Sequence, residues 1–222
     1  MSRSRVHRRQ HQGRRLEDEF GRRAKREGYP ARSVYKLEEI DQKVRLFRRG
    51  QRVLDLGASP GSWTLYAAER VGREGKVRGL DIKPHAAALP PNATIEVKDV
   101  RTVTAEELGG DRAFEVVMSD MAPATIGHRE TDMARSYELF MVALDLALRV
   151  LAPGGHFVGK IFQGGEFQNA HATLKKHFTT VKVVRPKATR EMSYEVFLVG
   201  LGRREPKAAA PTDAPPTSEP SA

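Results

Sequence analysis

Residues 52–63 of the chain read RVLDLGASPGSW, and this stretch decides the fold. Its apolar first half predicts a short buried strand over residues 53–56, and residues 62–71 predict a helix. A strand, a glycine-containing turn and a helix, in this order, form the first unit of a nucleotide-binding α/β sheet. The chain is therefore expected to be an α/β protein with a ligand site at this turn.

The turn itself indicates what kind of ligand it suits. Gly57 and Gly61 let the backbone approach a ligand closely because they have no side chains, and the first amides of the next helix are free to donate. Pro60 has no amide, and the turn lacks the G-x-G-x-x-G spacing that cradles a pyrophosphate. The turn therefore suits a ligand without phosphates. A tight strand-to-helix turn that binds nothing is the alternative.

Two carboxylates follow the next predicted strands. Asp81 comes after residues 77–80, about twenty positions beyond the turn, where an acidic residue commonly accepts hydrogen bonds from a ribose diol. Asp99 follows the apolar run of residues 94–97, at a place suited to an acceptor for an adenine amino group. Together with the turn, Asp81 favours a cofactor that contains adenosine. Taken alone, either carboxylate could simply face water.

Length and composition exclude several classes of protein. The chain has 222 residues, enough for one α/β domain with a substantial core and too few for two large ones. It contains no cysteine, and its seven histidines show no ligand spacing, so we expect no metal. No run of about 18 apolar residues is present, and the N-terminus lacks the apolar segment of a secretory signal. A cytoplasmic monomer without a membrane span is the default expectation.

Positive charge is concentrated in residues 1–52. This segment holds 17 Lys and Arg against seven Asp and Glu, whereas the rest of the chain holds 21 of each. A polyanion, with nucleic acid as the first candidate, is a natural partner for such a block beside a cofactor site, and such binding should weaken with salt. A solvated charged arm is the alternative.

Composition also divides the chain into three parts. Residues 1–15 are almost free of apolar side chains, and residues 205–222 are rich in Pro and Ala. We expect a disordered basic arm and a disordered tail there. Residues 16–204 form the predicted folded domain.

The predicted domain alternates strands with helices. Ser33 is expected to cap the second helix. The remaining elements are expected as helices over residues 16–26, 34–44, 133–151 and 167–178, and strands over 114–118, 156–162, 181–184 and 194–201, with a stop at 152–155. The last two strands are joined by too few residues for a crossover helix and should be antiparallel. This order predicts a largely parallel sheet with helices on both faces and ligands beyond the carboxyl ends of its strands.

Five segments of the chain resemble the FtsJ (RrmJ/RlmE) family of ribosomal RNA 2′-O-methyltransferases, in family order and spacing. They are ARSVYKLEEID, VLDLGASPGSW, VMSDMAPATIGH, APGGHFVGKIFQG and SYEVFLVGLGR. The resemblance covers roughly residues 31–203 and implies the Rossmann-like S-adenosylmethionine-dependent methyltransferase fold, a seven-stranded, mostly parallel sheet with one antiparallel strand. It also implies 2′-O-methylation of a uridine ribose in the A-loop of large-subunit (23S) ribosomal RNA, on the assembled 50S subunit.

The same resemblance implies the site residues. The catalytic tetrad would be Lys36, Asp120, Lys160 and Glu195, and no tetrad position departs from the family pattern. The contacts to S-adenosyl-L-methionine would be Gly61, Trp63, Asp81, Asp99 and Asp120, to which the turn adds Gly57.

The chemistry assigns roles within this tetrad. Methyl transfer from a sulfonium to a ribose hydroxyl is an in-line displacement, and the hydroxyl proton needs an acceptor. Lys160 is the candidate base; it either loses its proton once the cationic cofactor is bound or stays charged and orients the hydroxyl oxygen. Asp120 would fix Lys160, and Lys36 would pair with Glu195. Without the resemblance, both pairs would count as ordinary surface ion pairs.

Several alternatives stay open. Trp63 could pack in the core or wall the methionine end of the cofactor, and Tyr194 could pack in the core or offer a surface for base stacking. The tetrad reports a ribose reaction and not which RNA is bound, so transfer RNA is an alternative substrate. A non-catalytic ribosome-assembly factor is disfavoured by the intact tetrad. An NAD-dependent oxidoreductase is disfavoured by Pro60 and the missing third glycine.

Overall fold

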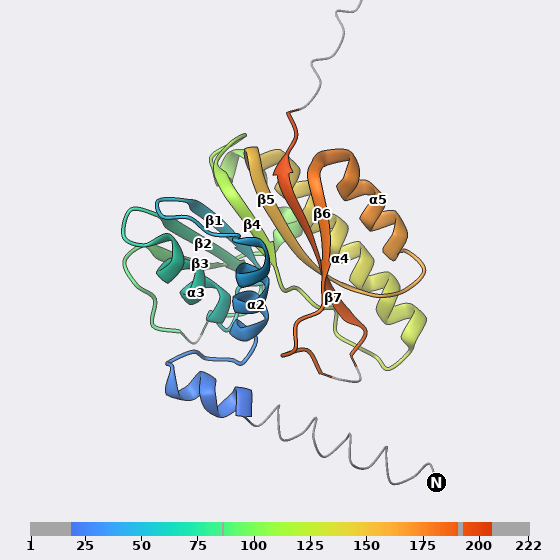
Figure 1. Cartoon of the computed structure of the whole chain (residues 1–222), viewed down its shortest axis with the longest axis horizontal. Helices are drawn as coiled ribbons and strands as arrows, with labels where there is room; N and C mark the ends of the chain where they lie inside the picture. The colour runs from blue at the N-terminus through green and yellow to red at the C-terminus, as the bar shows by residue number, and fades with distance from the viewer. Residues whose placement is uncertain (1–18, 86, 191–192, 206–222) are drawn as a thin grey trace, which may run out of the picture.

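The computed structural model describes residues 19–85, 87–190 and 193–205 (Figure 1). The elements are α2 (Val34–Val44), β1 (Arg52–Leu56), α3 (Ser62–Val71), β2 (Lys76–Asp81), β3 (Ala93–Val97), the 3-10 turns η1 (Val100–Thr102) and η2 (Glu106–Leu108), β4 (Phe114–Ser119), α4 (Arg129–Val150), β5 (Leu151–Phe162), α5 (Phe167–His177), β6 (Phe178–Val184) and β7 (Glu195–Arg203). A helix over residues 19–26 precedes them. The predictions for residues 1–15 and for the tail after residue 205 lie outside the described residues.

The described strands form one seven-stranded sheet in the order β3-β2-β1-β4-β5-β7-β6. Strand β7 runs antiparallel to β5 and β6, and the other pairings are parallel. The predicted mixed sheet with one antiparallel strand is therefore confirmed. The chain builds outward from β1 to β3 and then returns to add β4 on the other side of β1. This reversal opens a crevice beyond the carboxyl ends of β1 and β4.

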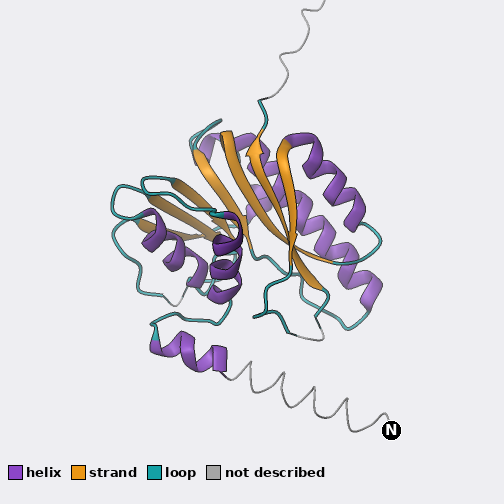
Figure 2. Cartoon of the chain, viewed as in Figure 1, coloured by secondary structure: helices purple, strands orange, loops and turns teal. Residues whose placement is uncertain are grey.

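Helices cover both faces of the sheet, as expected (Figure 2). Helices α2 and α3 contribute to one hydrophobic core, and α4 and α5 contribute to the other. Strand β7 supplies both cores, because successive side chains of a strand point to opposite faces. Phe197 belongs to the core of α2 and α3, whereas Val196 and Leu198 belong to the core of α4 and α5. Each such fully buried side chain contributes roughly 1.5–3 kcal/mol of transfer free energy.

Two predictions about helix starts were wrong, one for the cap of α2 and one for the first residue of α4. Ser33 precedes α2, but its side chain makes no capping hydrogen bond, so the predicted cap is wrong. The backbone of Ser33 is itself helical, with φ −58° and ψ −21°, unlike the extended backbone of most capping residues. Helix α4 begins at Arg129, four residues before the predicted start, because its first turn is polar and adds nothing to the apolar stripe. The side chain of His128 caps it by accepting from the Thr131 amide.

Strand β5 begins at Leu151, directly after α4, and not at His156. Its pairing with β4 jumps from Phe114–Leu151 to Val116–His156, so the predicted stop at residues 152–155 is an irregularity inside the strand. Strand β6 likewise begins at Phe178, three residues earlier than expected. No helix in the described part of the chain has the length and apolar character needed to cross a membrane.

Candidate active site at the carboxyl edge of the sheet

A cavity of about 760 Å³ lies at the carboxyl edge of the sheet. Its walls come mainly from the segments that follow β1, β2, β3 and β4, and α4 closes one side. Four of the residues singled out from the sequence line it: Gly57, Asp81, Asp99 and Asp120. The fold thus gathers carboxylates that are up to 39 positions apart in the sequence.

The glycine turn is tightly packed against neighbouring parts of the chain. Gly57 has φ +81°, and a Cβ at this position would lie 2.6 Å from the Cγ of Met121. Its amide donates to the carbonyl of Leu80 at 2.8 Å and is therefore not free for a ligand. Gly61 has φ +110°, and a Cβ there would lie 2.6 Å from the Cβ of Ala87. Glycine is therefore required at both positions because other segments of the chain approach closely. The prediction from the sequence considered only contact with a ligand.

Asp81 is fixed by the backbone on both sides. Its Oδ2 accepts from the Ser59 amide at 2.9 Å, and its Oδ1 accepts from the Lys83 amide at 2.8 Å. A carboxylate has about four lone-pair sites, so two remain available. An oriented carboxylate with two open acceptor sites in a cavity matches the two hydroxyl donors of a ribose diol.

Asp99 forms an ion pair with Arg101, which was not predicted from the sequence. The guanidinium of Arg101 binds both carboxylate oxygens, with Nη2 2.6 Å from Oδ2, and its amide donates to Oδ1. These contacts lower the pKa of Asp99. Asp99 therefore caps the turn η1, and an adenine amino group at this point would share the carboxylate with Arg101.

Trp63 lies in the core, and its ring does not line the cavity. Its side chain is 3% exposed and packs on Phe197, with 5.6 Å between ring centroids. The indole Nε1 donates to the carbonyl of Ser33 at 2.9 Å. Of the two interpretations that the sequence left open for this side chain, core packing is the one observed. Only the backbone of Trp63 remains for a cofactor contact.

Lys160 and Asp120 form the first pair of the predicted tetrad. Strands β4 and β5 are neighbours with Ser119 opposite Gly159, so the next residues on both strands lie side by side. Lys160 is 7% exposed. Its Nζ donates to the backbone carbonyl of Asp120 at 2.5 Å and to its Oδ1 at 2.8 Å. The ammonium nitrogen is thus held against Asp120, which lines the cavity.

Lys36 and Glu195 form the second pair. The Nζ of Lys36, on α2, lies 2.6 Å from Oε1 of Glu195 at the start of β7. It also lies 5.9 Å from the ring centroid of Phe197. Phe197 is the cross-strand partner of Lys160, and Glu195 precedes it by two residues on the same face. The two pairs therefore occupy diagonal positions on neighbouring strands, with backbones roughly 7–8 Å apart.

A buried carboxyl beneath the site was not singled out from the sequence. Asp55 in the middle of β1 is fully buried, and its Oδ2 accepts from Thr64 Oγ1 at 2.6 Å. Its Oδ1 has no hydrogen-bond partner among the described residues. Burial raises the pKa of Asp55 to about 7, and the negative charges of Asp120 and Asp81 add to the effect. The sequence feature that could have identified this carboxyl is its position between two leucines of a predicted buried strand.

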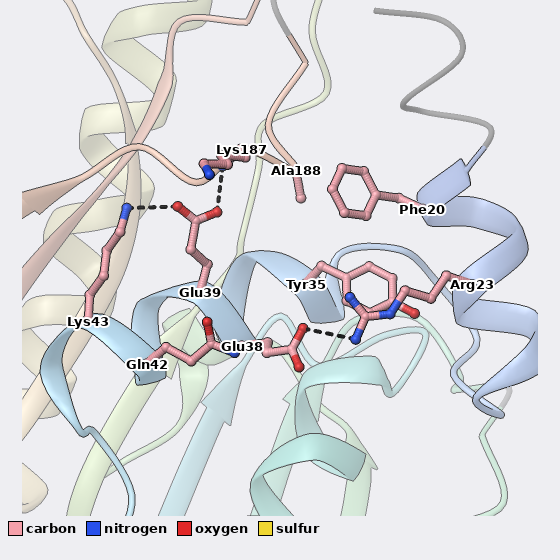
Figure 3. A pocket seen from close by; sticks show the side chains of 9 residues that line it. All are labelled: Phe20, Arg23, Tyr35, Glu38, Glu39, Gln42, Lys43, Lys187 and Ala188. Carbon is pink, nitrogen blue, oxygen red and sulfur yellow. Dashed lines mark hydrogen bonds and ion pairs between the residues drawn. The ribbon is translucent and has the colours of Figure 1, made fainter.

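Other parts of the described surface carry less chemistry. A second cavity, of about 500 Å³, lies between the helix over residues 19–26, α2 and the segment before β7 (Figure 3). Both of its carboxylates form ion pairs, Glu39 with Lys43 and Glu38 with Arg23. In the described residues no group of three or more His, Cys, Asp or Glu gathers as a metal site would require.

The sheet order and the carboxylate-lined cavity at the carboxyl edge define a Rossmann-like methyltransferase. The model of the FtsJ-like methyltransferase family matches residues 29–203, and the chain belongs to this family. The match confirms the resemblance found in the sequence. Membership also implies S-adenosylmethionine as the methyl donor.

Relatives and solved structures agree with this assignment. Ribosomal RNA large subunit methyltransferase E of Sorangium cellulosum is 54% identical over 187 residues, which are 84% of this chain and 88% of that protein. The protein of the same name from Desulfosudis oleivorans is 48% identical over 194 residues, 87% of this chain and 94% of that protein. A ribosomal RNA methyltransferase structure from Plasmodium falciparum superposes with a TM-score of 0.69 at 26% identity, covering 79% of this chain and 98% of that one.

Proposed function

We propose that this enzyme methylates the ribose 2′-hydroxyl of a uridine in the A-loop of large-subunit (23S) ribosomal RNA, on the assembled 50S subunit. The observation that carries the ribose reaction is the Lys160–Asp120 contact, with Nζ 2.8 Å from Oδ1 of a carboxylate that lines the cavity. The RNA class is supported by two similar proteins that carry the name ribosomal RNA large subunit methyltransferase E.

The residues around the cavity fit S-adenosylmethionine, which supplies an electrophilic methyl group on a sulfonium when bound. Asp81 would accept the two ribose hydroxyls through its open lone pairs, and Asp99 would face the adenine amino group beside Arg101. Asp120 would lie near the methyl end. Negative carboxylates in the lining also suit a cationic cofactor. Gly57, Gly61 and Trp63 would contribute through their backbone.

Lys160 can manage the hydroxyl proton in either protonation state. As an ammonium it has three N–H donors, and Asp120 takes two of them. The third would then donate to the ribose oxygen and orient it for in-line attack. As a neutral amine it keeps both hydrogen bonds to Asp120 and turns its lone pair outward, which would accept the hydroxyl proton. Asp120 thus aims Lys160 at the substrate in both cases.

Lys36 and Glu195 would position the ribose from the other side. Glu195 is 8% exposed and Lys36 lies at its Oε1, so the pair is shielded from water. Shielded charges act more strongly than exposed ones. We expect substitution of either residue to lower kcat less than substitution of Lys160, because neither receives the proton.

The test is transfer of labelled methyl from S-adenosylmethionine to large subunits, protein-free ribosomal RNA and transfer RNA, followed by mapping of the label. Wild-type enzyme should label one ribose hydroxyl of the A-loop on the subunit. Lys160→Ala should abolish labelling while binding of the subunit is retained, and Lys182→Ala, an exposed lysine on β6, should leave it unchanged. Label on transfer RNA alone would overturn the substrate, and unchanged labelling by Lys160→Ala would overturn the mechanism.

A further inference from the structure

Tyr194 and Arg129 form an exposed aromatic–cation stack. Tyr194 is 47% exposed, which is unusual for a large ring. The Cζ of Arg129 lies 4.2 Å from the ring centroid. A planar guanidinium stacks readily on an aromatic face. Within the described residues Arg129 has no ion pair with a carboxylate, in contrast to Arg149 at the other end of α4, which pairs with Asp145 at 2.7 Å.

This stack lies beside the tetrad, at the same edge of the sheet. Tyr194 directly precedes Glu195, so their Cα atoms are about 3.8 Å apart. Glu195 points toward Lys36 on the α2 side, and Tyr194 meets Arg129 on the α4 side, as the alternation along a strand requires. The segment between Asp120 and Arg129 joins the catalytic wall to the stack. An RNA strand with its ribose at Lys160 would therefore pass the stack with a neighbouring nucleotide.

The backbone that carries Tyr194 is fixed before any ligand binds. The Tyr194 carbonyl accepts from the Gln163 amide at 2.9 Å, which ties it to the end of β5. On the other side, the Glu195 amide donates to Ser193 Oγ at 3.2 Å. A ring carried on a fixed backbone and packed against Arg129 loses less conformational freedom on binding than a ring on a mobile segment. The stack is therefore suited to hold a flat ligand at low entropic cost.

The geometry points to a base-stacking platform: Arg129 and Tyr194 bind an unpaired nucleobase that flanks the methylated nucleotide. This inference rests on the proposed function and adds a specific RNA contact to it. Unstacked bases of RNA are commonly bound on aromatic rings and guanidinium planes. The positive charge of Arg129 also attracts the adjoining phosphate. A peptide with apolar side chains would gain nothing from the guanidinium.

The test measures KM and kcat for large subunits, together with the Kd of the subunits by filter binding. Tyr194→Ala should raise KM and Kd roughly 5- to 150-fold, the range for one base stacked on an aromatic ring. Tyr194→Phe keeps the ring and should stay within about twofold of wild type. The KM for S-adenosylmethionine should not change in either variant. Arg129→Ala should weaken binding and also flatten its salt dependence, since one cation is lost.

Matched controls separate the platform from general surface effects. Arg149→Ala removes an arginine from the same helix, and Val183→Ala removes an apolar side chain that is also 47% exposed. Both should leave KM and Kd unchanged. Equal Kd values for Tyr194→Ala and wild type would overturn the platform, and so would a loss in Tyr194→Phe as large as that in Tyr194→Ala. Filter binding keeps this result separate from the proposed function, which fails only if wild type transfers no methyl to the A-loop.

Discussion

Replacing Asp55 by Asn tests whether the buried carboxyl beneath the site is protonated in the folded protein. Asp55 is fully buried on β1, and its Oδ1 lacks a partner among the described residues. Burial raises its pKa to about 7, whereas the unfolded chain releases this proton near 3.8. Asn is close in shape to the neutral acid and keeps a carbonyl to accept from Thr64 Oγ1.

The sign and size of the effect follow from this difference. Between pH 4 and 7 the folded state holds a proton that the unfolded state has released, so the stability of wild type falls as the pH rises. The fall is about 1.4 kcal/mol for each pH step and roughly 4 kcal/mol in total, after which it levels off above pH 7. Asp55→Asn has no such proton. Its stability relative to wild type should therefore increase by roughly 3 kcal/mol between pH 5 and pH 8.

The assay is urea unfolding of wild type and Asp55→Asn at pH 5 and pH 8, in the absence of cofactor. Asp145→Asn serves as the control, because Asp145 is exposed on α4 and its substitution should change stability by less than about 0.5 kcal/mol at either pH. A difference between Asp55→Asn and wild type that is the same at both pH values would refute the reasoning. It would mean that Asp55 is ionised in the fold.

Two further substitutions test the packing of α2 and of the glycine turn. Asp41→Ala should lower the free energy of unfolding, measured in urea, by about 2–4 kcal/mol. The reason is that Asp41 accepts hydrogen bonds from the Leu46 and Phe47 amides and from the Tyr66 hydroxyl. A loss below 1 kcal/mol would contradict this. Gly57→Ala should weaken S-adenosylmethionine binding at least tenfold by calorimetry, since its Cβ would meet Met121 at φ +81°. Met121→Ala in the same chain should restore part of that affinity, and no restoration would place the defect elsewhere.

The strands of the fold were predictable because their signals are local. An apolar run such as residues 114–118 reports a buried strand wherever it lies, and the short link between the last two strands already required an antiparallel pair. The order of the sheet then brought Asp81, Asp99 and Asp120 to one cavity. The order of these strands along the chain predicts this, since the carboxyl ends of parallel strands share one edge.

The details of the site that were missed depend on contacts between distant or exposed groups. Arg101 forms a hydrogen-bonded ion pair with Asp99, but an arginine two positions after an aspartate does not by itself predict this pair. The start of α4 was missed because the Arg129 turn carries no apolar residue, and the stack of Arg129 on Tyr194 joins residues 65 positions apart. Tyr194 had been left open between core and stacking surface, and its exposure excludes the core.

The burial of Trp63 explains how the second ion pair is held. Its indole donates to the Ser33 carbonyl ahead of α2 and packs on Phe197 of β7, so one side chain of α3 connects both elements. Lys36 lies one helical turn after Ser33, and Glu195 lies two residues before Phe197 on the same face. Trp63 therefore fixes the distance between the elements that present these two charges. Trp63, for which the sequence left core packing and a cofactor wall open, thus acts on the site through the core, by holding α2 against the sheet.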